Sequence, residues 1–182
     1  MENIKQFGEL IQGDDFKEIA NPWTNERFKY ENIFYYTLKD NNYIAKKTQN
    51  NEYIHLIKTS YQFKKDKIYK LEFDVNYKGG DFDIGFADFT KTTFNAKLAS
   101  SENFVAINKD SLIINKNTIY NNIKIENGKK YEFIIDMKKK NFILNINNTK
   151  VGEFSFDFQD NIFAQASIRN IGNSVKIKTY EK

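Results

Sequence analysis

Two carboxylates, Glu72 and Asp74, come closest in type and spacing to the acid/base pair of an enzyme. They are separated by one residue in the stretch YKLEFDVNY, where they alternate with Leu71, Phe73 and Val75. Alternate residues of a strand share one face. Glycosidases use two carboxylates about 5–5.5 Å apart for retention and farther apart for inversion. The pair is therefore a candidate catalytic site, and two solvent-facing strand carboxylates are the alternative.

A second acidic set, Asp81, Asp83 and Asp88, is a candidate metal site, and Asp14 with Asp15 is a further possibility. Hard cations such as Ca²⁺ take six to eight oxygen ligands, often from clustered carboxylates and carbonyls. The spacing matches no specific calcium loop, so ordinary surface acids are the alternative. We expect no required cofactor, with Ca²⁺ as a possible one.

The single histidine, His55, limits other chemistry. A histidine zinc site or a Ser-His-Asp triad would have to use it as the sole imidazole. It alternates with Ile54 and Leu56 in EYIHLIK, so we expect it on a strand face.

Aromatic residues offer a way to bind sugars. Trp23 is the only tryptophan and follows Pro22 in a loop-like stretch. Exposed rings stack on sugar rings, and ligand sites join apolar walls to a few polar groups. Alternatively, Trp23 fills one end of the core. The tyrosines that extend this candidate ligand-binding platform are Tyr30, Tyr35, Tyr36, Tyr53 and Tyr61.

Tyr35 and Tyr36 are adjacent, so on a strand one of them must point away from the main core. That ring is either covered by a partner or available to a ligand.

From about Phe28 onward the sequence alternates with a period of two, so strands must position most of these residues. The best helical candidate runs from about Phe7 to Ile19. Apolar/polar alternation predicts half-buried antiparallel strands. Gly79-Gly80 indicates a two-residue hairpin turn. The other expected turns are Asn-Lys-Asp, Asn-Gly, Lys138-Lys139-Lys140, Asn147-Asn148 and Ile-Gly-Asn. The expected strands are YIAKKTQ, EYIHLIK, YKLEFDVNY, DFDIGF, NFVAIN, SLIINK, NIKIEN, KKYEFIIDM, NFILNIN, KVGEFSF, FAQASIRN and SVKIKTYE.

Size and composition favour one β-rich domain spanning 1–182, with residues 1–27 packing on it as an N-terminal segment. The chain has no cysteine, which excludes disulfides and thiolate metal sites. No apolar run suits a signal peptide or a membrane span, and the compartment stays open. The net charge of +4 is mixed along the chain, so nucleic acid is an unlikely partner.

The segment from Tyr131 to Phe158, with its charged turn and NNTKVGEF, resembles the C-terminal half of concanavalin A-like (laminin-G-like) jelly rolls. There a strand of the form F-x-L-x-I-N-G leads to x-V-G-x-F and two closing strands. GDDFKEIANPWTNERFKYENIFYYTLKD resembles the opening of such domains. The resemblance implies an antiparallel β-sandwich of concanavalin A-like jelly-roll type.

Laminarinase-type enzymes on this fold carry E-x-D-x-x-E on one catalytic strand. This chain matches the first two positions with Glu72 and Asp74, but Tyr77 stands where the last Glu belongs. The resemblance therefore implies that the acid/base residue is missing.

Three classes of function follow. The leading expectation is a non-catalytic, lectin-like module that binds carbohydrate. The alternative is a structural, adhesion or virion-decoration protein that engages other proteins and can form oligomers. A glycoside hydrolase or polysaccharide lyase is third, disfavoured by the incomplete carboxylate pattern.

Overall fold

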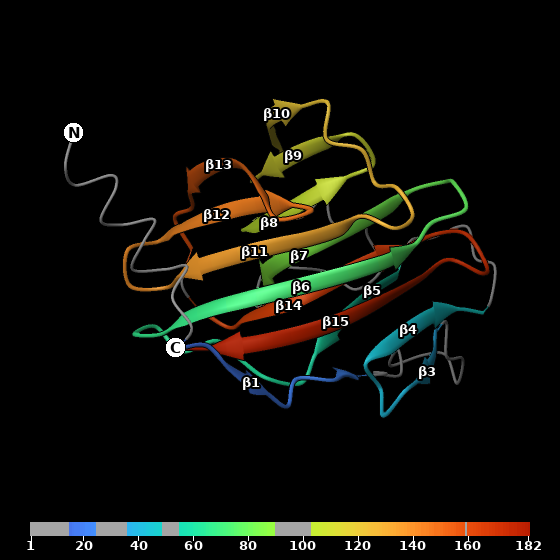
Figure 1. Ribbon diagram of the computed structural model, residues 1–182, viewed down its shortest axis with the longest axis horizontal. Helices are drawn as coiled ribbons and strands as arrows, with labels where there is room; N and C mark the ends of the chain where they lie inside the picture. Colours follow the sequence, from blue (N-terminus) through green and yellow to red (C-terminus); the bar gives the residue numbers. More distant parts are fainter. Residues whose placement is uncertain (1–14, 25–35, 49–54, 90–102, 159) are drawn as a thin grey trace.

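The computed structural model describes residues 15–24, 36–48, 55–89, 103–158 and 160–182, which form two antiparallel sheets packed face to face (Figure 1). The expected all-β antiparallel sandwich is confirmed. In the described part of the chain, no helix is long and apolar enough to cross a membrane.

The eight-stranded sheet is built around β6 and β15, which pair along their whole length. Its spatial order is β13 (Thr149–Ser155), β12 (Asn141–Ile146), β11 (Lys130–Asp136), β6 (Ile68–Asn76), β15 (Ser174–Glu181), β4 (Ile44–Lys47) and β3 (Tyr36–Lys39). The short strand β1 (Lys17–Ile19) pairs with the C-terminal end of β15, and β4 pairs with its N-terminal end.

The seven-stranded sheet lies behind it in Figure 1 and is centred on β7 and β14. Its spatial order is β10 (Asn117–Asn121), β9 (Ser111–Ile114), β8 (Phe104–Asn108), β7 (Phe82–Asp88), β14 (Ile162–Ile168), β5 (His55–Thr59) and β2 (Trp23–Thr24). The strands β10 and β13 therefore end their respective sheets, and both lie at the upper margin of the sandwich in Figure 1.

Three of the predicted turns close hairpins as expected. Asn108-Lys109-Asp110 joins β8 to β9, Lys138-Lys139-Lys140 joins β11 to β12, and Asn147-Asn148 joins β12 to β13. Asn147 and Asn148 have φ of 51° and 62°. A two-residue turn with both φ values positive matches the twist of the strands it joins, and asparagine tolerates that conformation.

The hairpin predicted at Gly79-Gly80 is wrong. Gly79 and Gly80 instead carry the chain from β6 in one sheet to β7 in the other. Their φ values of 104° and 86° belong to a region that glycine adopts without strain. The Gly79 carbonyl accepts hydrogen bonds from the side-chain amides of Asn170 and Asn173 at 3.0 and 2.9 Å, which ties this crossover to the loop before β15.

Two further elements differ from expectation. NIKIEN forms no strand, although Ile123 and Ile125 are buried; their N–H groups donate to the carbonyls of Asp110 and Lys109, both at 3.0 Å. These two carbonyls belong to the β8–β9 turn and not to a strand. The two hydrogen bonds therefore do not extend into strand pairing. The helix predicted for Phe7 to Ile19 is wrong at its described end, where residues 17–19 pair with β15 as strand β1.

The core fills the space between the sheets with side chains from alternate positions of each strand. Phe86 of β7 lies at the centre of an aromatic cluster. Its ring centroid is 5.3 Å from that of Phe156, 5.6 Å from Phe142, 5.9 Å from Phe158 and 6.0 Å from Phe133. One side chain of the seven-stranded sheet thus contacts two strands of the other sheet and the segment that follows β13.

We expect Phe86→Ala to lower the free energy of unfolding by about 3–5 kcal/mol, because it opens a cavity among four rings. Phe86→Leu keeps most of the volume and should cost clearly less. Urea denaturation followed by circular dichroism measures both. Equal losses for the two variants would contradict a role for Phe86 in filling the centre of the core.

Candidate functional site

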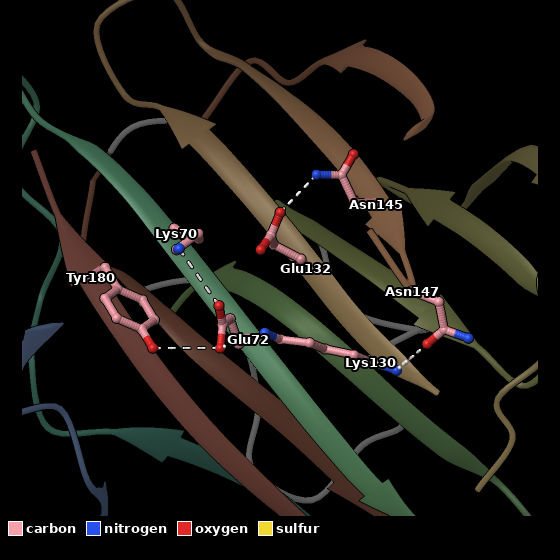
Figure 2. A network of polar contacts seen from close by, with 7 residues as sticks. All are labelled: Lys70, Glu72, Lys130, Glu132, Asn145, Asn147 and Tyr180. Atoms are coloured by element: carbon pink, nitrogen blue, oxygen red, sulfur yellow. Dashed lines mark hydrogen bonds and ion pairs between the residues drawn. The ribbon is translucent and has the colours of Figure 1, made fainter. Parts of the chain in front are cut away.

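The predicted carboxylate Glu72 lies on the outer face of the eight-stranded sheet, at the centre of a polar network (Figure 2). Its carboxylate is 2.9 Å from the Lys130 ammonium and 3.5 Å from the Lys70 ammonium. The Tyr180 hydroxyl donates to Glu72 Oε2 at 3.5 Å. Three donors from β6, β11 and β15 therefore surround this half-buried carboxylate.

A second carboxylate, Glu132, lies directly across from Glu72 in the β6–β11 register. Like charges at opposed positions repel one another. Asn145 of β12 donates to Glu132 Oε1 at 2.6 Å, and Lys178 of β15 lies across from Glu72 on the other side. The amide and the lysines offset the repulsion, so the network links four neighbouring strands.

The same carboxylates act on Tyr180. Burial, followed by the charges of Glu72, Glu18 and Glu132, raises the pKa of Tyr180 to about 12. Each of these factors disfavours the phenolate. Tyr180 therefore stays protonated, and able to donate to Glu72, above the pH at which an ordinary tyrosine ionises.

Asp74, the other half of the predicted pair, is exposed and lies in register between Lys130 and Lys176. It shares a face with Glu72, as predicted, and Lys130 lies near both carboxylates. At the position of the missing glutamate, the Tyr77 hydroxyl donates to the Gly80 carbonyl at 3.0 Å. This arrangement accounts for Glu72 as a link between strands.

The predicted aromatic platform is not assembled by the residues that the structure describes. Trp23 is only 1% exposed, and its ring packs against Phe73 in the core, 6.5 Å between centroids. Tyr36 is also buried; its hydroxyl accepts a hydrogen bond from the Ile168 N–H at 3.2 Å, and burial raises its pKa. The prediction that these two rings face a ligand is corrected, because both face the core.

Of the four remaining aromatic candidates, only Tyr61 lies within the residues that the structure describes. Tyr61 is half-buried, and its hydroxyl donates to Glu181 Oε2 at 2.8 Å. Tyr30, Tyr35 and Tyr53 lie outside the described residues, so their roles stay predictions.

Of the three predicted metal-binding aspartates, Asp83 and Asp88 lie on β7, and Asp81 lies just before it. Asp81 forms an ion pair with Arg169 at 3.2 Å, Asp83 is buried on β7, and Asp88 ends that strand. At about 3.3 Å per residue, Asp83 and Asp88 are roughly 17 Å apart, too far to share an ion. Across the described ranges, no three His, Asp or Glu residues gather closely enough to hold a metal.

Of the two other acidic candidates, the structure describes Asp15 alone, and it describes the strand position of the histidine. Asp15 forms an ion pair with Lys182 at 3.4 Å, and Asp14 lies outside the described residues. His55 begins β5 and pairs in register with Ile168. A binding site for Ca²⁺ stays an untested expectation.

Sequence reasoning missed a groove between the two end strands β10 and β13. Its volume is about 380 Å³, and its lining is Ile114, Asn115, Asn117, Ile119, Phe154, Ser155, Phe156 and Asp157. Asn115 Nδ2 donates to Asp157 Oδ1 at 2.8 Å, which connects the β9–β10 turn to the segment after β13. The groove is thus a preformed opening at the margin of the sandwich.

Exposed apolar side chains adjoin this groove. Ile119 is 47% exposed and Tyr120 is 44% exposed, and the Tyr120 ring meets that of Phe154 with centroids 6.5 Å apart. The sequence held a signal for this site, because Ile119 and Tyr120 are adjacent apolar residues in the otherwise polar stretch NTIYNN. Adjacent strand residues point to opposite faces, so a strand there could place only one of them in the core between the sheets.

Comparisons with known proteins identify the fold. A crystal structure of a human SPRY domain aligns with a TM-score of 0.63 at 14% identity, covering 79% of this chain and 94% of that one. The SPRY domain of human HERC1 gives 0.62 at 15% identity, covering 76% and 89%, and the PSpry domain of TRIM65 gives 0.57 at 8% identity, covering 79% and 85%. No protein-family model and no curated protein matches the sequence.

These likenesses establish the architecture of the chain. It is a SPRY-like β-sandwich, and SPRY domains have the concanavalin A-like fold, which confirms the jelly-roll resemblance seen in the sequence. At such low identity the likeness extends to the fold alone, because one fold carries many unrelated functions.

We expect Glu72→Gln to lower the free energy of unfolding by about 1–3 kcal/mol, because it leaves Lys70 and Lys130 beside a neutral amide. Asp74→Asn, on the same face but exposed, should change it by less than about 0.5 kcal/mol. Urea denaturation compares the two variants. Equal effects would argue that Glu72 has no special place in the network.

Buried Lys47 makes stability depend on alkaline pH. Its ammonium lies 4.9 Å from the centroid of the Tyr36 ring, and burial lowers its pKa to about 8. Between pH about 8 and its ordinary pKa near 10.4, the unfolded chain binds a proton that the folded chain has lost. Stability should therefore rise with pH across this window.

Above pH about 10 the trend should reverse, because burial raises the pKa of Tyr36 and of Tyr131 above the value in the unfolded chain. Thermal melts from pH 7 to 11 should show a maximum that Lys47→Met removes. Lys46→Met, a half-buried neighbour on the opposite face, is the matched control. A maximum that survives in Lys47→Met would refute this assignment.

Proposed function

We propose that this chain is a non-catalytic module that binds a segment of another protein. The observation that carries the proposal is the groove between β10 and β13, with Ile119 and Tyr120 exposed beside it. Apolar side chains grouped at a preformed opening are typical of binding surfaces rather than of a surface that only meets water.

Two further observations support protein binding over the other expected functions. Of the three described aromatics that were expected to contact sugar, Trp23 and Tyr36 are buried in the core, and the hydroxyl of half-buried Tyr61 is bonded to Glu181. Glu72 is surrounded by cations within the sheet. The fold is also that of SPRY domains, which are protein–protein interaction modules, and this analogy favours the same function.

The test is a selection of short random peptides on the folded chain, run beside a glycan array in Ca²⁺ and again in chelator. The heat-unfolded chain is the control for general adhesion to apolar surface. We expect peptides with a shared pattern to be enriched only on the folded chain, and their synthetic forms to bind saturably. Saturable glycan binding without any peptide enrichment would refute the proposal and restore the lectin interpretation.

A further inference from the structure

We propose that the partner segment lies extended along the groove between β10 and β13, with apolar side chains between Ile119 and Phe154 and a basic side chain at Asp157. This inference rests on the proposed function and specifies its site and ligand.

The position of the groove favours an extended ligand. β10 and β13 are the terminal strands of the two sheets, and all five residues of β10 are exposed. A peptide that lies beside these two strands in an extended form would run along the strand direction. Extended peptides bind such edges, placing alternate side chains into pockets and the others toward solvent.

The floor of the groove is apolar and rigidly held. Ile114 and Phe156 are buried members of the main core, and Phe156 packs against Phe86. A volume of about 380 Å³ is near the lower end of the roughly 300–1,000 Å³ typical of ligand pockets. The groove therefore suits a few apolar side chains of a peptide.

The charge in the groove indicates which polar side chain the partner segment should carry. Among the described residues that line the groove, Asp157 is the one with a charge, and it is exposed. Asn115 donates to one carboxylate oxygen, Oδ1. A lysine or arginine of the partner would pair with this carboxylate, so we expect a basic residue beside the apolar ones.

The irregularity of β10 favours a separate partner over a second copy of this chain. The β9–β10 register shifts between Thr118 and Tyr120, on either side of Ile119. Bulges of this kind hinder edge-to-edge pairing of identical sheets. The partner segment is accordingly held by side chains in the groove and not by a long ladder with another β10.

The experiment measures the selected peptides on three variants by fluorescence polarisation. Ile119→Asp should weaken binding by about tenfold or more, as expected at the centre of an interface. Ile171→Asp is the matched control, because Ile171 is 48% exposed but lies in the loop between β14 and β15. It should leave the affinity within about twofold of the original. Thermal melts of each variant confirm folding.

Asp157→Asn tests the charge alone, because its side-chain carbonyl can still accept the hydrogen bond from Asn115. We expect it to weaken peptides that carry Lys or Arg and to reduce the salt dependence of their binding. Peptides in which the basic residue is replaced by Gln should bind Asp157→Asn and the unaltered chain equally.

Each other outcome overturns this inference in a distinguishable way. Peptides that bind Ile119→Asp as tightly as the unaltered chain would place protein binding elsewhere while the proposed function stands. Equal losses for Ile119→Asp and Ile171→Asp would indicate general adhesion. Self-association of the chain that Ile119→Asp abolishes, measured by analytical ultracentrifugation, would assign the groove to a second copy. No enriched peptide at all would instead refute the proposed function.

Discussion

The contact of aromatic rings between the two sheets is the constraint on which the rest of the molecule depends. Phe86 of β7 meets Phe133 of β11 and Phe142 of β12, and Phe156 reaches the same cluster from the segment after β13. Burying each of these rings gains about 1.5–3 kcal/mol. The chain after β13 must therefore turn inward, and this turn leaves the margin beside β10 open as a groove with a fixed floor.

The outer face of the eight-stranded sheet meets a different requirement, because charged residues there must tolerate one another at close spacing. Glu72 and Glu132 lie opposite each other, and Lys70, Lys130 and Asn145 supply the compensating contacts. Exposed ion pairs alone contribute little, but these carboxylates are half-buried. Their arrangement helps to fix the pairing register of β6 with β11, because a slip by one residue would place these charged side chains on the core face.

Local pattern in the sequence predicted the long strands and three of the hairpins, because both depend on alternation and on turn residues such as Asn147-Asn148, but it did not predict the short strands β1, β2 and β10. It failed where the structure of a segment depends on pairing between strands that are distant in the sequence. Gly79-Gly80 has the sequence of a hairpin turn, yet β6 pairs with β11 and β15 while β7 pairs with β8 and β14. Trp23 likewise stands in a loop-like stretch, but pairing of β2 with β5 places its ring in the core.

The site was the least predictable part, because its residues gain meaning only from the meeting of two sheet edges. Ile119 and Phe154 are far apart in the sequence and belong to different sheets, so no motif joins them. The glutamates, by contrast, formed a recognisable pattern that the structure uses between strands. A prediction based on reactive residue types therefore favoured the carboxylates on the polar face of the sheet and missed the apolar groove between β10 and β13.

The energetics of the groove set what kind of binding it can support. Removing Ile119 and Tyr120 from water would gain at most about 1.5–3 kcal/mol each, and an ion pair at Asp157 would add about 1 kcal/mol or less at such an exposed position. Association costs an estimated 4–15 kcal/mol, and ordering an extended segment adds to it. Several further apolar side chains of the partner must therefore be buried against Ile114 and Phe154. Because the gains from these residues only approach the cost of association, the groove suits weak, reversible recognition of a short segment.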